Sequence, residues 1–169
     1  ARAFGIEVLT SDPFVTAEAV SKEGATKVEL SELLSGSDFV TLHSPLIPET
    51  EKMMSVAEFA QMKPDAFLIN CARGGLIDED ALYDALTSGG IGGAGLDVLV
   101  DIDPPLDHRL IQLENLIVTP HTAFFSQEAV LELEERSAGE AVRVFRGQMP
   151  DNVYNREVLS HSRTKLAAE

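Results

Sequence analysis

The chain has 169 residues, of which 44% are hydrophobic, and a formal net charge of −15. This length and apolar content suffice for one compact core and exclude a disordered chain. The acidic balance argues against direct binding of nucleic acid, because that binding depends on neutralising phosphates with lysine and arginine. No apolar run reaches the length of a membrane span, and residues 1–5 lack the hydrophobic region of a signal peptide, so we expect a cytoplasmic protein.

Short apolar runs, many of them β-branched, alternate with helical patterns along the chain. The predicted strands are residues 6–10, 26–28, 39–42, 66–70, 94–98 and 116–119. The predicted helices between them are residues 16–23, 30–35, 56–61, 79–88 and 106–113. Strands that alternate with helices indicate right-handed crossovers and a mostly parallel sheet that is covered on both faces. The predicted fold class is therefore α/β, doubly wound.

Local signals support several of these helix boundaries. Ser55 and Glu58 have the spacing of a capping box, and Asp78 is a predicted N-cap. Gly89 and Gly90 follow the helix that Asp78 opens, and glycines at this place typically end a helix.

A long helix is predicted after the last strand. Ser126 is placed to cap it, Gly147 ends it, and residues 126–147 form a connecting element. Its predicted apolar face consists of Val130, Leu133, Ser137, Ala141 and Phe145. Residues 148–169 begin as an extended segment and become polar, so we expect this tail to return to a domain that the sequence does not contain.

The most informative run is residues 68–78, in which an arginine follows a buried strand. Ligands of open α/β sheets bind at the carboxyl ends of the strands, so Arg73 is placed to meet a small anion. Its planar set of donors suits a carboxylate, and its charge does not titrate. Cys71 is the only cysteine, which excludes an internal disulfide, and its place behind an apolar strand predicts a small, buried packing residue.

Titratable side chains also lie at the other predicted strand ends. Asp97 belongs to one strand, and Asp101 and Asp103 follow it. His121 follows the last strand. Because these strands are predicted to be parallel, the side chains should share one edge of the sheet with Arg73, which indicates a single site rather than scattered polarity.

The sequence contains no Gly-rich phosphate loop. No G-x-G-x-x-G precedes residue 6, and the glycines of residues 89–93 follow a helix and precede a strand, which is the wrong order for a phosphate cradle. The first predicted strand instead resembles the second strand of a dinucleotide fold, followed by Asp12, an acid suited to ribose hydroxyls. Asp12 before Pro13 is equally typical of a turn. We therefore expect this chain alone to bind a dinucleotide poorly.

Taken in order, these motifs resemble the C-terminal part of the D-isomer-specific 2-hydroxyacid dehydrogenases. This family includes phosphoglycerate, formate and D-lactate dehydrogenases and the C-terminal-binding-protein corepressors. The resemblance covers nearly the whole chain and rests on residues 42–46, 48–50, 70–74, 95–98 and 119–121. It implies that residues 1–125 are a partial, Rossmann-like NAD-binding domain that lacks its first strand and Gly-rich loop.

The resemblance implies a catalytic set of Arg73, Asp103 and His121. Arg73 would bind the carboxylate of a 2-oxo acid and polarise its carbonyl, while His121 would protonate the carbonyl oxygen as NADH delivers hydride. A carboxylate beside His121 would orient the ring and favour the imidazolium. In the family this acid is usually a glutamate directly before a proline, and here Asp103 takes that place one residue later than usual. Asp101 is the alternative.

The resemblance also implies the residues that bind the cofactor. Asp12 would hold the adenosine ribose and favour NAD over NADP, because a carboxylate repels a 2′-phosphate. Asp97 would lie near the nicotinamide carboxamide. The full implied set is Asp12, His43, Ser44, Pro45, Thr50, Cys71, Ala72, Arg73, Asp97 and His121, and no metal ion is implied.

The predicted function is hydride transfer between NAD(H) and a small D-2-hydroxy or 2-oxo acid, with a homodimer in the full-length protein. The alternative is an NAD-sensing scaffold without turnover, and Phe124 and Phe125 resemble an aromatic pair of the corepressor-like branch. Arg73 and His121 together favour the enzyme, since a scaffold needs neither. A phospho-receiver domain would need paired acids after the first strand and a lysine after the last one, and the sequence has neither.

Overall fold

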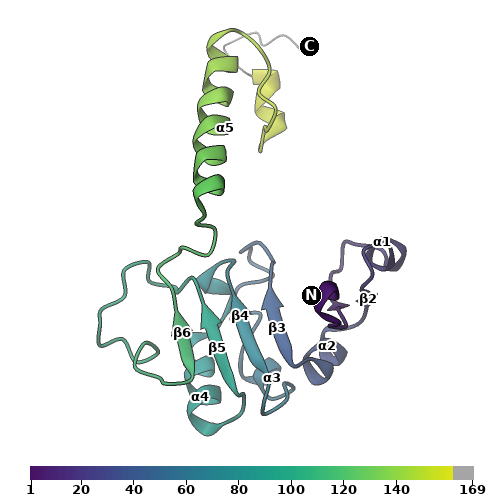
Figure 1. Cartoon of the computed structure of the whole chain (residues 1–169), viewed down its shortest axis with the longest axis vertical. Helices are drawn as coiled ribbons and strands as arrows, with labels where there is room; N and C mark the ends of the chain where they lie inside the picture. Colours follow the sequence, from purple (N-terminus) through teal and green to yellow (C-terminus); the bar gives the residue numbers. More distant parts are fainter. Residues whose placement is uncertain (162–169) are drawn as a thin grey trace. The chain divides into compact units, whose positions relative to one another are not determined.

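The computed structural model of the protein describes residues 1–161, and its largest feature is a four-stranded parallel sheet (Figure 1). The strands lie in the order β3 (Phe39–Leu42), β4 (Phe67–Asn70), β5 (Gly93–Leu96) and β6 (Leu116–Val118). In the register of the sheet, Leu42 pairs with Asn70, Asn70 with Leu96, and Leu96 with Val118. All four strands therefore end in one line, and the predicted α/β class is confirmed.

One face of this sheet carries the hydrophobic core. Side chains alternate along the strands, so that Leu42, Leu68 and Leu96 are buried on the same face. They form one cluster with side chains of α3 (Val56–Phe59) and α4 (Glu79–Ser88), including Leu82, which is completely buried. The core thus lies between the sheet and these two helices.

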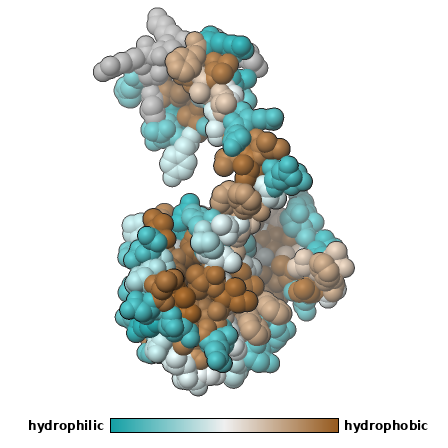
Figure 2. All heavy atoms as spheres, turned by 60° about the vertical axis from the view of Figure 1, so that its left-hand side comes forward, coloured by the Kyte–Doolittle hydropathy of each residue, from teal (hydrophilic) through white to brown (hydrophobic). Residues whose placement is uncertain are grey.

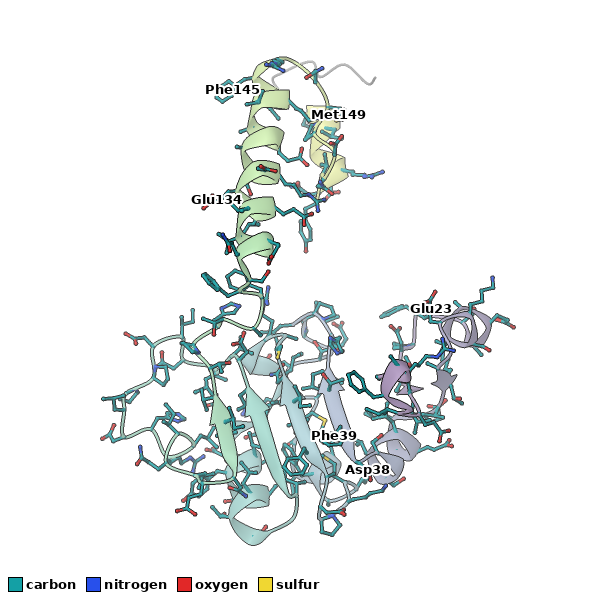
Figure 3. The ribbon with its side chains drawn as sticks, viewed as in Figure 1. Glu23, Asp38, Phe39, Glu134, Phe145 and Met149 are labelled. Carbon is teal, nitrogen blue, oxygen red and sulfur yellow. The ribbon has the colours of Figure 1, made fainter. Side chains whose placement is uncertain are left out.

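The opposite face of the four-stranded sheet is open. Phe39 is 61% exposed, Phe67 44% and Ile117 72%, and the rings of Phe39 and Phe67 stack with their centroids 5.7 Å apart (Figure 3). Figure 2 shows hydrophobic side chains gathered over a broad area of the unit that contains this sheet. The prediction that helices cover both faces is therefore wrong for the part of the chain that the structure describes.

The first two strands form a separate, two-stranded parallel sheet. β1 (Leu9–Thr10) and β2 (Thr26–Lys27) pair only with each other, joined by α1 (Ala17–Lys22), and α2 (Leu30–Gly36) leads on to β3. A single sheet was predicted, but within residues 1–161 no strand bridges β1 and β3. β1 is also shorter than the predicted 6–10 because Ile6 lies half exposed, outside any ladder.

The predicted helix over residues 106–113 is wrong, because this segment consists of turns. The His108 N–H donates to the Pro105 carbonyl oxygen at 2.8 Å and the Ile111 N–H to that of His108 at 3.0 Å, which is turn spacing. Leu110 is completely buried, and the Arg109 guanidinium lies 4.6 Å from the centre of the Tyr83 ring on α4. These anchors fix the segment without a helical ladder.

The predicted caps are confirmed. The Asp78 carboxylate accepts the Asp80 N–H at 3.1 Å and the Ala81 N–H at 3.4 Å at the start of α4. Gly89 ends the helix with φ 72°, a left-handed conformation that glycine adopts readily. Ser55 and Glu58 form the capping box of α3, whose end at residue 59 is two residues earlier than predicted.

Loss of the α4 cap has a predictable cost. Asp78→Ala is expected to lower the free energy of unfolding by about 1 kcal/mol at neutral pH, whereas Asp78→Asn, which can still cap, should cost less. Lys52 Nζ donates a hydrogen bond to the Asp78 carboxylate at 3.2 Å, and this bond is the main cause that holds the pKa of Asp78 below its ordinary value. Desolvation by burial acts in the opposite direction and raises the pKa.

The stabilisation from Asp78 therefore depends on pH. Because the pKa of Asp78 is lowered in the folded state, the stabilisation is complete above the ordinary aspartate pKa of about 3.9. The stabilisation is lost as the pH falls through the pKa that Asp78 has in the folded state. Urea unfolding of the chain and of Asp78→Ala at neutral and acid pH should show the difference shrinking in acid. An equal difference at both pH values would contradict this assignment.

The chain divides into two compact units, residues 1–123 and a second unit that begins at Phe124. The second unit contains α5 (Gln127–Phe145), capped by Ser126, whose Oγ accepts the Ala129 N–H at 3.0 Å. Gly147, with φ 75°, follows the end of the helix as predicted. The predicted apolar face of α5 is not buried, since no residue within Gln127–Phe145 is.

The extended segment after α5 packs back along the helix. The Glu140 carboxylate accepts the N–H groups of Asp151 and Asn152, and Arg143 Nε donates to the Met149 carbonyl oxygen at 2.8 Å. A short 3-10 helix, η3 (Arg156–His161), follows, and the rest of the predicted polar tail, residues 162–169, lies outside the described residues. Among residues 1–161, no helix is both long and apolar enough to cross a membrane.

Candidate functional site

The candidate site lies at the carboxyl edge of the four-stranded sheet. The strands end in register, so His43, Cys71, Asp97 and Thr119 are the next residues in line after them. This edge is where parallel α/β sheets bind their ligands. The predicted gathering of strand ends at one edge is confirmed for these four segments.

Arg73 is carried by a loop that the end of β4 holds in place. Asn70, completely buried, donates from Nδ2 to the Arg73 carbonyl oxygen at 2.8 Å and accepts the Ala72 N–H on Oδ1 at 3.0 Å. The Arg73 side chain itself is exposed, and its Nη1 donates to the Ala72 carbonyl oxygen at 2.7 Å. The loop backbone is thus fixed while the guanidinium faces outward.

Gly74 brings this loop against the segment that follows β5. A Cβ at this position would lie 2.2 Å from the carbonyl carbon of Leu99, so no other residue fits without moving that backbone. A short 3-10 helix, η2 (Gly74–Leu76), then leads to Asp78. Gly74 therefore permits a close approach of two backbones.

The prediction that Cys71 is a buried packing residue is wrong, because its side chain is exposed. β4 ends at Asn70, and it is the Asn70 side chain that takes the inward place at the strand end. Cys71 is the next residue, and in extended backbone the next side chain points to the opposite side.

The loop that carries His121 is held by Asp97, which is only 4% exposed. Oδ1 of Asp97 accepts the Thr119 hydroxyl at 2.5 Å and the Thr122 N–H at 2.8 Å, and Oδ2 accepts the Ala123 N–H at 3.0 Å. The His121 N–H also donates to the Asp97 carbonyl oxygen at 2.9 Å. These bonds hold His121 at φ 54°, a left-handed conformation uncommon for any residue but glycine.

The Asp97 carboxyl group is ionised in this setting. Burial raises its pKa, but the bonds from Thr119, Ala123 and Thr122, with the charge of His121, together lower it below the ordinary aspartate value. Three donors occupy three of the roughly four acceptor positions of a carboxylate, which leaves one for an outside donor such as the amide of a nicotinamide ring. The contact of Asp97 with the nicotinamide carboxamide stays a prediction.

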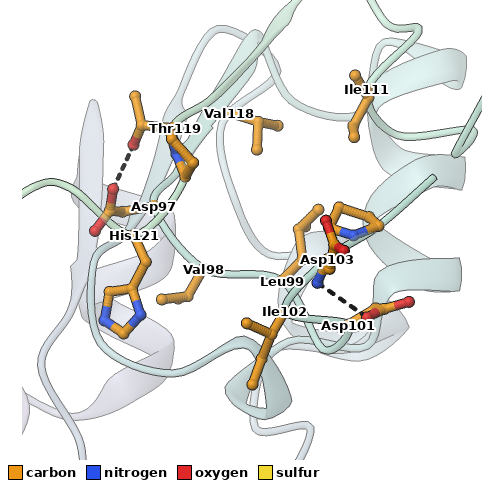
Figure 4. Close-up of a pocket in the computed structure, with 12 residues that line it drawn as sticks. Asp97, Val98, Leu99, Asp101, Ile102, Asp103, Ile111, Val118, Thr119 and His121 are labelled. Atoms are coloured by element: carbon orange, nitrogen blue, oxygen red, sulfur yellow. Dashed lines mark hydrogen bonds between the residues drawn. The ribbon is translucent and has the colours of Figure 1, made fainter. Parts of the chain in front are cut away.

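A cavity of about 300 Å³ separates the His121 loop from the segment after β5. Its walls include Asp97, Asp101, Asp103 and His121. Figure 4 shows Asp103 and His121 on opposite sides of this cavity. Asp101, the alternative partner, accepts the Asp103 N–H on Oδ1 at 3.1 Å. The pairing of either acid with His121 stays a prediction.

The other predicted cofactor residues occupy loops after β1 and β3. Asp12 Oδ1 accepts the Phe14 N–H at 2.7 Å, so Asp12 forms the turn that was its alternative interpretation. The Thr50 hydroxyl donates to the Pro45 carbonyl oxygen at 2.6 Å and accepts the Ile47 N–H at 3.0 Å, which fastens its loop.

The remaining members of that set lie near the strand ends. A ring nitrogen of His43 is 3.1 Å from the Thr41 hydroxyl, and Ser44 beside it is partly buried. Pro45 is exposed, and Ala72 is partly buried. The assignment of each of these residues to the cofactor stays a prediction.

Two residues of the site were given no role from the sequence. Asn70 holds the Arg73 loop, and Thr119 is bonded to the Asp97 carboxylate. A signal was present for Asn70, since a polar residue in phase with the buried positions of an apolar strand needs a hydrogen-bonding partner. The role of Thr119 depends on a contact across 22 positions of sequence, for which no local signal exists.

Comparisons with known proteins agree on the relationship. Residues 1–123 match the family model of the D-isomer specific 2-hydroxyacid dehydrogenase, NAD binding domain. D-3-phosphoglycerate dehydrogenase of Methanocaldococcus jannaschii is 41% identical over 156 residues, which are 92% of this chain and 30% of that protein. Glyoxylate reductase of Korarchaeum cryptofilum is 39% identical over 159 residues, 94% of this chain and 48% of that protein.

Solved structures show the same fold. D-lactate dehydrogenase from Lactobacillus jensenii, determined with NAD⁺, superposes with a TM-score of 0.82 at 34% identity, covering 92% of this chain and 50% of that one. The chain thus spans half or less of the length of these relatives. With a family model over most of its length and relatives at about two-fifths identity, the chain belongs to the D-isomer-specific 2-hydroxyacid dehydrogenase family, in its NAD-binding domain.

Proposed function

We propose that the chain is the NAD-binding part of a longer dehydrogenase that interconverts a small 2-oxo acid and its D-2-hydroxy acid. The observation that carries the proposal is the presence of an arginine and a histidine on two separately anchored loops at one sheet edge, with the histidine lining a cavity. The relatives are named for phosphoglycerate, glyoxylate and lactate chemistry, and all three names denote small 2-hydroxy or 2-oxo acids.

Each side chain has a distinct part in this reaction. The Arg73 guanidinium binds the carboxylate of the 2-oxo acid through two parallel N–H donors and draws charge from the adjacent carbonyl. The His121 ring gives a proton to the carbonyl oxygen in the direction of reduction and takes it back in oxidation. NADH, when bound, supplies the hydride. Proton and hydride together convert the 2-oxo acid into the 2-hydroxy acid.

The proposal extends to the finer organisation of the protein. Asp103 is proposed to reach His121 when substrate fills the cavity between them, and Asp101 is its alternative. Residues 126–147 are proposed to connect to a substrate domain, and residues 148–169 to return to it. The full-length protein is proposed to be a cytoplasmic homodimer that discriminates its substrate through residues outside this chain.

The test is loss of NADH absorbance by the full-length protein with a panel of 2-oxo acids. Turnover of at least one acid, with the D-2-hydroxy acid as product, is the expected result. Calorimetry of the 169-residue chain with NADH is the companion measurement, and weak binding is expected because this sequence has no Gly-rich phosphate loop. Micromolar binding by the chain alone would contradict that second expectation.

A scaffold that binds NAD without turnover is the second candidate. It is favoured by one observation, namely that Asp103 and His121 lie on opposite sides of the cavity (Figure 4). Tight NADH binding by the full-length protein with no turnover of any 2-oxo acid would establish the scaffold and exclude the dehydrogenase.

A further inference from the structure

Two polar side chains, Asn70 and Asp97, are buried in the part of the chain that the structure describes. Both lie at the carboxyl edge, at the ends of neighbouring strands β4 and β5. Burying a polar group is unfavourable unless it is hydrogen-bonded, so such residues persist where their bonds are needed. The partners of these two side chains therefore indicate what the burial accomplishes.

The partners of each side chain belong to one functional loop. Asn70 bonds the main chain of Ala72 and Arg73 with both ends of its amide. Asp97 bonds the Thr119 hydroxyl and the main-chain N–H groups of the two residues after His121. Neither side chain reaches the guanidinium or the imidazole directly by these bonds. They act on the backbone that carries those groups.

The two anchors are also joined to each other. The Asp97 N–H donates to the Asn70 carbonyl oxygen at 2.9 Å, as a continuation of the β4–β5 ladder. A main-chain bond thus connects the residue that holds the Arg73 loop to the residue that holds the His121 loop. Because both anchors belong to one sheet, the separation of the two loops is set by the spacing of adjacent strands.

We propose that Asn70 and Asp97 are a pair of positioning residues that fix the spacing between the Arg73 loop and the His121 loop. The pair rests on the proposed function and deepens it, because the two loops carry the groups that bind the carboxylate and move the proton. Asn70 acts through Arg73, and therefore on binding of the 2-oxo acid. Asp97, with Thr119, acts through His121 and therefore on proton transfer.

The left-handed backbone at His121 gives Asp97 its particular task. This conformation is strained for a histidine and persists only where surrounding bonds impose it. Bonds from the Asp97 side chain to Thr122 and Ala123, directly after the strained residue, supply that constraint. Release of them is expected to let the loop relax and turn the imidazole away from the cavity.

The first experiment uses amide hydrogen exchange, followed by NMR, in the 169-residue chain. The amides of Ala72, Thr122 and Ala123 should be protected although Thr122 and Ala123 lie at the surface. Asn70→Leu should accelerate exchange at Ala72 alone, and Asp97→Asn should accelerate it at Thr122 and Ala123 alone, each by about tenfold or more. Asp65→Asn removes an exposed aspartate just before the other end of β4 and is the matched control.

Three results decide the outcome of the hydrogen-exchange experiment. Rapid exchange of Thr122 and Ala123 in the unaltered chain would overturn the proposal without any variant. Equal acceleration at all three amides in both variants would overturn the division into two anchors. If Asp97→Asn fails to fold, Thr119→Val replaces it, since this variant keeps the side-chain shape and removes one bond to the Asp97 carboxylate. It should still accelerate exchange at Thr122, and no effect there would count against the proposal.

The second arm measures kinetics in the full-length protein. Asn70→Leu is expected to raise KM for the 2-oxo acid by about tenfold or more with a smaller change in kcat, whereas Thr119→Val should lower kcat with little change in KM. A general loss of stability would not produce this split, so equal changes in both parameters would overturn the assignment. Protected amides without any turnover would refute the proposed function and leave the loop anchors standing.

Discussion

Arg73→Ala is expected to lower kcat/KM of the full-length protein for its 2-oxo acid by about 10²- to 10³-fold, the usual cost of losing a donor at a reacting centre. The physical reason is that the exposed guanidinium at the carboxyl edge is the cation placed to pair with the substrate carboxylate. The exposed Arg73 side chain bonds the carbonyl oxygen of its neighbour Ala72, so the free energy of unfolding should change little. Steady-state NADH oxidation and urea unfolding measure the two quantities.

Two further variants make the Arg73 prediction specific. Arg73→Lys keeps the charge but loses the planar pair of donors, so it should recover only part of the activity. Arg136→Ala removes an exposed arginine on α5 that pairs with Glu132 at 3.1 Å, and it should leave kcat/KM unchanged because exposed ion pairs contribute little. An unchanged kcat/KM in Arg73→Ala would refute the proposal that Arg73 binds the carboxylate of the substrate.

His121→Asn is expected to reduce kcat by about 10²- to 10⁴-fold, the range of a lost general acid. Asparagine is the right replacement because it tolerates the left-handed backbone recorded at this position, φ 54°, better than most residues do. The substitution therefore removes the proton donor without adding backbone strain. Single-turnover measurements should place the loss in the chemical step.

The comparison variants for His121 separate chemistry from strain. His121→Val should lose activity and also lower the free energy of unfolding, since a β-branched residue is poorly suited to positive φ. His161→Asn changes an exposed histidine in η3 and should leave kcat unaltered. A rate in His121→Asn within threefold or so of the unaltered protein would remove His121 from the mechanism, since it falls far short of the loss of a general acid.

The four-stranded sheet was predictable because its strands coincide with short apolar runs that are separated by helical patterns. β3 and the expected strand over residues 39–42 coincide, and β4 begins one residue later than expected. The absence of a helix over residues 106–113 was not predictable, because Leu106, Leu110 and Leu113 have helical spacing while only Leu110 is fully buried. Periodicity reports where apolar side chains recur, and it does not report that one of them anchors a chain of turns.

The site was predictable at Arg73 and His121 and not at the residues that hold their loops. Arg73 and His121 follow strand ends, which sequence patterns locate well. The bond from Thr122 to Asp97 spans 25 positions, and nothing local to either residue announces it. The inward orientation of Asn70, which leaves Cys71 exposed, depends on where β4 ends, and boundaries are the least certain part of any sequence-based assignment.

At Gly74 the loop of Arg73 packs directly against the backbone of Leu99, which belongs to one wall of the cavity. The backbone of Leu99 leaves room for a hydrogen at residue 74 and nothing larger, so any side chain there would displace this backbone. The loop of Arg73 and the segment that continues to Asp101 and Asp103 therefore meet with no side chain between them. Any substitution of Gly74 is consequently expected to increase the separation of these two loops.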